Sequence, residues 1–190
     1  MVNILKRQIF VNEIGITAEK TLLLSVGELN ENKNHSTVIK AIAKMGDHSV
    51  HYIIAGRGVL QKQLEKLAFC LGVASQVHFL GFRDDIADIM KVVDIYCLPS
   101  FREGLNVSLM EAIASGLPWI ASDIRGNRDL FGKGKGCLLP PDNPEIWAEC
   151  LKGVKKNQLK EKLNNKIFDF SVIKVESKMK RIYKNLYDET

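Results

Sequence analysis

The segment LPSFREGLNVSLMEAIASGLPWIASD, residues 98–123, indicates how the whole chain folds. An apolar run ends where the segment begins, and a helix is predicted from about Asn106 to Ser115. Gly116 ends that helix, and Pro118 prevents its continuation. The apolar run at 119–121 is short enough for a buried parallel strand. The segment therefore predicts a strand end, a polar loop, a helix and a second strand.

Two glutamates in this segment are candidate ligand-binding residues. Glu103 lies in the loop after the first strand, where ligands bind in open α/β sheets. Glu111 lies among apolar helix residues, where a buried carboxylate needs hydrogen-bond partners. The unpaired backbone N–H groups of Leu105, Asn106 and Val107 at the helix start can receive a phosphate without a metal. Together these groups could bind a polyhydroxylated phosphate ester, although the spacing alone equally allows two solvent-facing charges.

The rest of the chain alternates between strand and helix. At least five alternations predict a Rossmann-like, doubly wound parallel α/β sheet with its ligand site at the carboxyl ends of the strands. Because no repeat, low-complexity stretch or Gly/Ser linker interrupts the 190 residues, we expect a single domain. Besides the run at 119–121, the predicted strands are Thr21–Val26, Val50–Ala55, Val77–Leu80, Asp94–Leu98 and Cys137–Leu139. The other predicted helices are Ile4–Glu13, Ser36–Met45, Val59–Leu71, Ile86–Val93, Arg128–Leu130 and Pro144–Val154, followed by a charged helix to Tyr187.

Composition is that of a soluble globular protein, with 46% hydrophobic and 26% charged residues. No apolar run approaches the roughly 20 residues of a membrane span, and the N-terminus does not resemble a signal peptide. Four cysteines without a C-x-x-C pair suggest reduced, buried thiols, and the histidines lack ligand spacing. We therefore expect a cytoplasmic protein with no bound metal.

Positive charge gathers in a basic helical tail, residues 152–190. Between Lys152 and Lys184 there are eleven Lys and Arg residues and three acids, so this stretch carries +8 while the whole chain carries +5. Such a tail could contact an anionic membrane at its inner face or a lipid-linked acceptor. Nucleic acid is not expected as a partner, because no nucleic-acid-binding motif accompanies the charge. A solvated lysine-rich helical face is the simplest interpretation.

Three further loops follow predicted strands and supply candidate residues. Gly27 permits close backbone approach and Lys33 can reach a phosphate, unless it is an ordinary exposed lysine. The Gly56-Arg57-Gly58 sequence lacks the third glycine of a dinucleotide fingerprint, and a tight turn explains it equally well. Phe82 could stack on a base or belong to the core.

The stretch SFREGLNVSLMEAIASGLPWIASDIRG resembles the Glu-x7-Glu segment of the family 4 (group 1) retaining glycosyltransferases, which have the GT-B fold. Gly27 to Asn34 is similar to a second segment of that family, V-G-R-L-x-x-x-K-G/N. Glu28 departs from it, because the family commonly has an arginine there that neutralises the donor diphosphate. Matching positions are Gly27, Leu29, Lys33, Asn34, Ser100, Glu103, Gly104, Glu111, Ala112, Ala114, Gly116, Pro118, Ile120 and Ala121.

The resemblance covers roughly residues 21–151 and implies the carboxyl-terminal, donor-binding half of a GT-B enzyme. Such an enzyme also has an amino-terminal acceptor domain. Nothing in this chain corresponds to that domain, so we expect a truncated chain, a gene fragment or half of a split enzyme that is inactive alone. The implied reaction moves a sugar from a nucleotide diphosphate, by family habit uridine diphosphate, to an acceptor hydroxyl with retention at the anomeric carbon. No metal or other cofactor is implied.

The resemblance also implies a role for each candidate residue. Glu103 would be the catalytic contact to the donor sugar, and Glu111 would accept the ribose hydroxyls. Lys33 and the amides after Gly104 would stabilise the departing diphosphate. In place of the missing arginine, Arg57 or Arg102 could serve, and Phe82 would line the base pocket.

The loop sequence at 27–35 also resembles capsule-type members, which implies synthesis of a bacterial surface polysaccharide or lipid-linked glycan. Two alternatives remain open from the sequence. One is a stand-alone, non-catalytic nucleotide-sugar-binding module, and the other is half of a sugar-nucleotide epimerase. The donor sugar and the acceptor are not determined by these residues.

Overall fold

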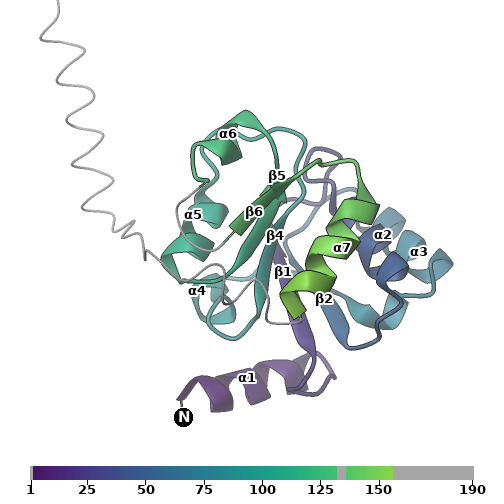
Figure 1. Ribbon diagram of the computed structural model, residues 1–190. Helices are drawn as coiled ribbons and strands as arrows, with labels where there is room; N and C mark the ends of the chain where they lie inside the picture. Colours follow the sequence, from purple (N-terminus) through teal and green to yellow (C-terminus); the bar gives the residue numbers. More distant parts are fainter. Residues whose placement is uncertain (1, 132–135, 156–190) are drawn as a thin grey trace, which may run out of the picture.

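The computed structural model describes residues 2–131 and 136–155, in which helices cover both faces of a six-stranded sheet (Figure 1). The strand order is β3-β2-β1-β4-β5-β6, and every pairing between named strands is parallel. The fold is therefore the doubly wound, Rossmann-like α/β sheet that the alternation predicts. The strands are β1 Thr21–Val26, β2 Val50–Ala55, β3 Val77–Gly81, β4 Ile95–Leu98, β5 Trp119–Ser122 and β6 Gly136–Leu139.

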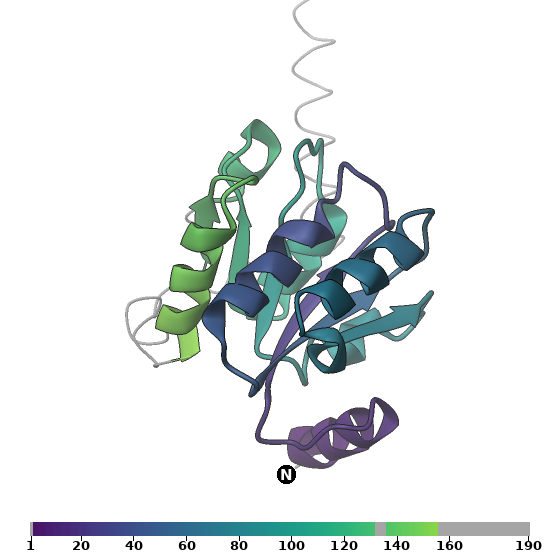
Figure 2. The same cartoon turned by 90° about the vertical axis from the view of Figure 1, so that its right-hand side faces the viewer.

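Two layers of helices enclose the sheet. Helices α2, α3 and α7 lie on the face turned toward the viewer in Figure 2, and α1, α4 and α5 cover the opposite face. None of the helices within the described ranges is long and apolar enough to cross a membrane. The helices are α1 Val2–Glu13, α2 His35–Met45, α3 Gln61–Cys70, η1 Ala74–Gln76, α4 Ile86–Ile89, α5 Val107–Ala114, α6 Arg125–Arg128 and α7 Pro144–Lys155.

Alternate residues of each central strand enter the two halves of the core. In β1, Leu23 packs with α2, α3 and α7, whereas Leu22 and Leu24 pack with α1, α4 and α5. All three side chains are fully buried. Because both faces of a parallel sheet are covered, the strand reads as an uninterrupted apolar run.

The strand order reverses between β1 and β4, which are neighbours in the sheet although β2 and β3 lie between them in sequence. The crossovers leave β1 and β4 toward opposite faces, and the loops after these two strands meet at the point where open α/β sheets have their ligand crevice. Ligands of open α/β sheets bind at this kind of position. The two loops, residues 27–34 and 99–106, are the ones that contain Lys33 and Glu103.

The predicted helix Ile86–Val93 is wrong in length, since α4 ends at Ile89. Arg7 accounts for the early end, because its guanidinium donates hydrogen bonds to the Val92 carbonyl and to the Asp94 carboxylate. Those bonds hold the chain in a turn, and β-branched valines have only moderate helix propensity. The strand after this turn begins at Ile95, one residue later than predicted.

Two more helix boundaries differ from the prediction. Helix α3 begins at Gln61 and not at Val59, because the Leu60 backbone N–H is bonded to the Leu29 carbonyl of the neighbouring loop. Helix α6 begins at Arg125, earlier than the predicted Arg128–Leu130. Its residue Asn127 donates a hydrogen bond from Nδ2 to the Ser122 carbonyl at 2.9 Å, which fixes this earlier turn. The basic tail predicted for 152–190 shares residues 152–155 with α7 and otherwise lies outside the described residues.

His35 makes the stability of the fold dependent on pH. Its ring is 2% exposed, and Nδ1 lies 2.9 Å from the Tyr52 hydroxyl. Burial lowers the pKa of His35 from 6.5 to about 4, against a smaller opposing effect of the Glu28 carbonyl. The unfolded chain therefore binds a proton that the folded chain does not, and stability falls as the pH drops from about 6.5 toward 4.

We expect this histidine to remove roughly 2 kcal/mol of stability between pH 7.5 and 5. Urea unfolding at the two pH values measures the loss. His51 and His78, whose Nδ1 and Nε2 atoms lie 2.9 Å apart, have lowered pKa values through burial and act in the same direction. The same two urea unfolding measurements are therefore made on His35→Asn. Its loss of stability between pH 7.5 and 5 should be smaller than that of the parent chain. Equal pH dependence in both chains would contradict the assignment.

Candidate functional site

Lys33 and Glu103 meet at the carboxyl ends of β1 and β4. Lys33 Nζ lies 2.7 Å from Glu103 Oε1, and their side chains are 20% and 11% exposed. Gly27 makes room for the lysine, because a Cβ at that glycine would lie 3.0 Å from Lys33 Cε. The chain thus holds a largely desolvated ion pair at the crevice, with both partners from the predicted set.

Asn32 ties together the two loops that carry this pair. Its side-chain Nδ2 donates to the Arg102 carbonyl at 2.8 Å, and its Oδ1 accepts from the Arg102 backbone N–H at 3.0 Å. Its own carbonyl accepts from the Phe101 N–H at 2.8 Å. Three hydrogen bonds from one residue therefore fix the position of Glu103 relative to Lys33. Sequence reasoning missed Asn32, which looked like one polar loop residue among several.

The Gly56-Arg57-Gly58 turn supports the first loop from behind. A Cβ at Gly56 would lie 1.9 Å from the Gly27 carbonyl oxygen, and one at Gly58 would lie 2.4 Å from the Leu29 oxygen. Backbone hydrogen bonds join Leu29 N–H to the Arg57 carbonyl and Gly27 N–H to the Ala55 carbonyl, both at 3.0 Å. The two glycines are therefore required by close backbone packing.

The start of α5 is fixed by Asn106, which is 3% exposed. Its Oδ1 accepts from the Leu109 N–H at 2.8 Å and from Ser108 Oγ at 2.9 Å, as an N-cap does. Ser108 Oγ also lies 2.6 Å from the buried Tyr96 hydroxyl. Burial, with a smaller effect of the Glu103 charge, raises the pKa of Tyr96. The hydroxyl therefore stays protonated and can hold the cap in place.

The phosphate contact predicted at Asn106 uses its backbone N–H, so the capping role of its side chain leaves that prediction open. Within the described residues, the backbone N–H groups of Val107 and Ser108 have no hydrogen-bond acceptor. Leu105 and Val107 are 71% and 58% exposed, so the first turn of α5 is open to solvent. An anion at this end would meet free N–H groups and the positive end of the helix dipole.

Gly126 in α6 contacts the loop of Glu103 from the other side. A Cβ at this position would lie 2.5 Å from the carbonyl oxygens of both Glu103 and Gly104. Only glycine allows the two backbones to approach this closely. Sequence reasoning missed Gly126, although a glycine just after a predicted strand was an available signal.

Three other predicted residues are near the carboxyl edge but outside the ion pair. Glu111 is exposed on α5, so its carboxylate is not buried as the apolar neighbours suggested. Phe82, after β3, is 70% exposed and does not belong to the core. Arg57 is exposed, and its Nε would lie 3.8 Å from a Cβ at Gly81. The Lys33–Glu103 ion pair therefore includes none of these three side chains.

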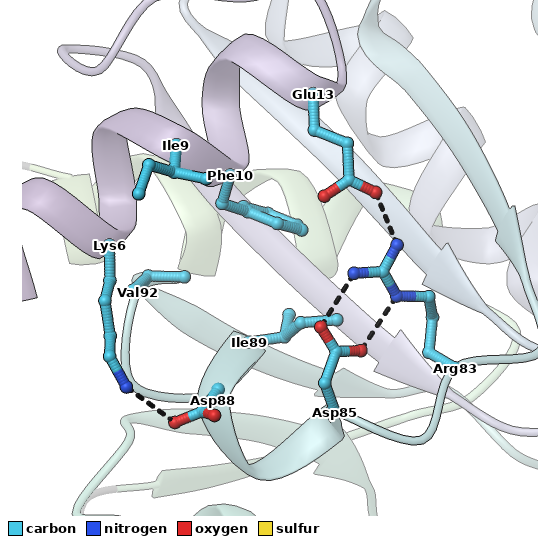
Figure 3. Close-up of a pocket in the computed structure, with 9 residues that line it drawn as sticks. All are labelled: Lys6, Ile9, Phe10, Glu13, Arg83, Asp85, Asp88, Ile89 and Val92. Carbon is cyan, nitrogen blue, oxygen red and sulfur yellow. Dashed lines mark hydrogen bonds and ion pairs between the residues drawn. The ribbon is translucent and has the colours of Figure 1, made fainter.

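Two hollows lie elsewhere on the surface. One of about 200 Å³ separates α1 from α4, with Phe10 and Ile89 at its base (Figure 3). An ion pair crosses it at each end, one between Lys6 and Asp88 and the other between Glu13 and Arg83. Arg83 is also paired with Asp85. A second of about 530 Å³ lies beside α2 and α3, where Asn30, Asn34 and Phe101 of the two crevice loops also line it. Neither is lined by Lys33, Glu103 or Glu111, and the ion pairs of the first fasten α1 to the sheet.

The chemistry available at the crevice is the binding of a phosphorylated, hydroxyl-rich ligand. Lys33 supplies one positive charge, and the α5 amides supply neutral donors beside it. Glu103 and Glu111 supply acceptors for hydroxyl groups. Within residues 2–131 and 136–155, no group of three or more His, Cys, Asp or Glu side chains is arranged to hold a metal ion.

Comparisons with known proteins identify the family and the fold. Residues 6–168 match the family described as glycosyl transferases group 1. The O-antigen biosynthesis glycosyltransferase WclY of Escherichia coli is 29% identical over 181 residues, which cover 93% of this chain and 50% of WclY. HepE of Anabaena, in a crystal structure with UDP and glucose, is 25% identical, with a TM-score of 0.74 over 81% of this chain and 44% of HepE.

A crystal structure of a separate C-terminal domain shows how far the likeness of fold extends. This domain of a glycosyl transferase group 1 family protein (LpcC) from Francisella tularensis superposes with a TM-score of 0.71 at 21% identity. The superposition covers 83% of this chain and 86% of the domain. The chain spans about a third to a half of the length of curated relatives that it matches. With its Rossmann-like sheet and the match over most of its length, the chain belongs to the group 1 family of glycosyl transferases.

Proposed function

We propose that this chain is the donor-binding, carboxyl-terminal half of a retaining GT-B glycosyltransferase, and that its donor is a UDP-sugar. The observation that carries the proposal is the Lys33–Glu103 pair, 2.7 Å apart at the strand-order reversal, beside the open first turn of α5. The complex of HepE with UDP and glucose supports the class of donor. The near-complete superposition on the separate C-terminal domain supports the placement in the fold.

Each residue then has a role set by its position. The diphosphate lies between Lys33 Nζ and the N–H groups of Val107 and Ser108. Glu103 accepts hydrogen bonds from the hydroxyls of the donor sugar, and Glu111, exposed on the same helix, accepts them from the ribose. Phe82 stacks on the base at the carboxyl end of β3.

The arrangement favours departure of the nucleoside diphosphate. As the bond between the sugar and the phosphate breaks, negative charge grows on the leaving oxygen. Lys33 and the α5 amides are already oriented toward that charge, so they stabilise it more in the transition state than in the ground state. The acceptor hydroxyl forms the new bond on the face that the diphosphate leaves, its proton passes to the departing phosphate oxygen, and the anomeric configuration is retained. We propose that no metal is needed, because the charge is met by a lysine and a helix N-terminus.

Glu28, where the family commonly has an arginine, cannot supply the positive charge of that arginine. Its Oε2 accepts a hydrogen bond from Asn30 Nδ2 at 3.0 Å and is exposed. With a second cation absent from that position, Lys33 carries a larger share of the electrostatic binding. We assign to Arg57 the role of an auxiliary cation, since it is exposed at the same edge of the sheet.

We further propose that the complete enzyme acts in the synthesis of a bacterial surface polysaccharide or lipid-linked glycan. The resemblance to an O-antigen biosynthesis enzyme over 93% of this chain supports this role. Acceptor binding would come from a second domain, so the 190-residue chain alone should bind the donor without transferring its sugar. An anionic membrane or a lipid-linked acceptor is the proposed surface for the basic tail.

Calorimetric titration of the chain with uridine diphosphate, in the presence of a chelator, tests the proposal. Saturable binding is expected, and Glu111→Ala should weaken it through loss of the ribose contact. Glu149→Ala, the same change on the exposed face of α7, is the matched control and should leave the affinity unchanged. If uridine, guanosine and adenosine diphosphates all fail to bind, the assignment of this chain as a self-sufficient donor site is wrong.

Gly126→Ala should weaken uridine diphosphate binding although it removes no contact to the ligand. The added methyl group would lie 2.5 Å from two carbonyl oxygens, so the loop of Glu103 must move outward together with the start of α5. A penalty of about 1.4 kcal/mol corresponds to a tenfold loss of affinity. Calorimetry measures the loss, and urea unfolding shows whether the fold survives. A folded variant with parent-like affinity would contradict the role of Gly126 in positioning this loop.

A further inference from the structure

The pair Cys137 and Cys150 is a feature that the donor site does not use. The four scattered cysteines suggest reduced, buried thiols, but Cys70 is exposed and Cys137 and Cys150 are only partly buried. The structure instead brings two of them together from β6 and α7, with their Sγ atoms 3.1 Å apart. Both are partly accessible, whereas Cys97 is fully buried. We propose that Cys137 and Cys150 form a redox-active dithiol that small-molecule disulfides oxidise to an intramolecular disulfide.

The geometry requires only a small movement. A disulfide has an S–S length near 2.05 Å, so the two sulfur atoms must approach by about 1 Å. Each side chain lies at the edge of the core that α7 forms with α2, next to fully buried residues. Cys70 is exposed at the end of α3, and Cys97 is fully buried, where burial and a smaller effect of Cys150 raise its pKa.

The two thiols have different roles in the exchange. Either sulfur can donate the hydrogen bond between the two thiols, and with Cys137 as the donor this bond lowers the pKa of Cys150 and raises that of Cys137. The Cys150 thiolate attacks one sulfur of a disulfide such as oxidised glutathione and displaces one glutathione thiolate. Cys137 then loses its proton and attacks the Cys150 sulfur, which displaces the second glutathione. Two protein thiols become one disulfide, and oxidised glutathione becomes two glutathione molecules.

The new bond would close a ring that contains the turn between β6 and α7. In this turn the Pro141 carbonyl accepts hydrogen bonds from Asn34 Nδ2 at 2.7 Å and Thr37 Oγ1 at 2.9 Å. The turn is thus already attached to the start of α2. Because a disulfide mainly restricts the unfolded chain, oxidation should stabilise the fold without moving these contacts.

Peptide mapping tests the proposal directly. No lysine or arginine lies between Gly136 and Lys152, so trypsin leaves both cysteines in one peptide, residues 136–152. The folded chain is treated with oxidised glutathione, unfolded, blocked with N-ethylmaleimide and digested. We expect the main form of this peptide to be unblocked and two hydrogen atoms lighter than its reduced form. Glu145 lies between the two cysteines, so cleavage after it leaves two fragments joined by the disulfide. These fragments should separate only when dithiothreitol is added.

Two further measurements complete the test. The urea midpoint of the oxidised chain should lie above that of the reduced chain, and dithiothreitol should reverse the shift. Cys70→Ser should leave the light peptide unchanged, whereas Cys150→Ser should abolish it. A peptide 136–152 that carries two maleimide or two glutathione groups would overturn the proposal. The mapping of the unsubstituted chain decides the matter even if a variant fails to fold.

Discussion

Lys33→Ala should reduce the affinity for uridine diphosphate roughly ten- to a hundredfold, the largest effect on binding expected from one substitution. A hydrogen bond to a charged group contributes about 1.5–3 kcal/mol, and this lysine is the cation that is paired with Glu103. The substitution also leaves Glu103, 11% exposed, without its partner. A diphosphate would then meet an uncompensated carboxylate, which adds repulsion to the lost attraction.

A set of variants separates these two effects by calorimetry. Glu103→Gln removes the competing carboxylate and frees the lysine, so uridine diphosphate should bind at least as tightly as to the parent chain. The double variant of Lys33→Ala with Glu103→Gln should bind better than Lys33→Ala alone, because the repulsion is gone. Lys62→Ala, the same charge change on the exposed face of α3, is the control. If Lys33→Ala bound uridine diphosphate as tightly as the parent chain does, the assignment of Lys33 to the diphosphate site would be wrong.

The sequence was sufficient to predict which loops meet, since this follows from topology. Alternating strands and helices predict a parallel sheet, and the ligand crevice of such a sheet lies at the carboxyl ends of its strands. Lys33 and Glu103, seventy positions apart, could therefore be assigned to one site before their contact was seen. The resemblance to a family added the roles, which the spacing alone left open.

Side-chain orientation and close packing could not be predicted in the same way. Glu111 lies among apolar residues in sequence, yet the helix turns it toward solvent, which a linear pattern does not reveal. Asn32 and Gly126 act through backbone atoms of distant loops, and such contacts leave no periodic signal. The approach of Cys137 to Cys150 likewise depends on how α7 docks on the sheet. Helix docking is determined by the shape of the whole core.

That docking depends most on Trp147, and Trp147→Ala should be the most destabilising of the substitutions considered. The indole is fully buried between α7 and the sheet, in the core shared with α2, and its Nε1 donates to the Pro140 carbonyl at 2.8 Å. Truncation of a buried tryptophan costs about 3–5 kcal/mol. Since single domains are stable by about 5–15 kcal/mol, the loss would be a large part of the total.

Urea unfolding of three variants distinguishes packing from hydrogen bonding at this position. Trp147→Phe keeps most of the apolar contact and should lose less than Trp147→Ala, with about 1 kcal/mol attributable to the hydrogen bond. Ile146→Ala changes the neighbouring residue, which is 37% exposed, and should have a small effect. If Trp147→Ala shifted the midpoint no more than Ile146→Ala, α7 would not be docked as described. In the expected case, loss of Trp147 removes the support of the turn that holds the start of α2, so Trp147→Ala should also weaken uridine diphosphate binding through the adjacent Lys33 loop.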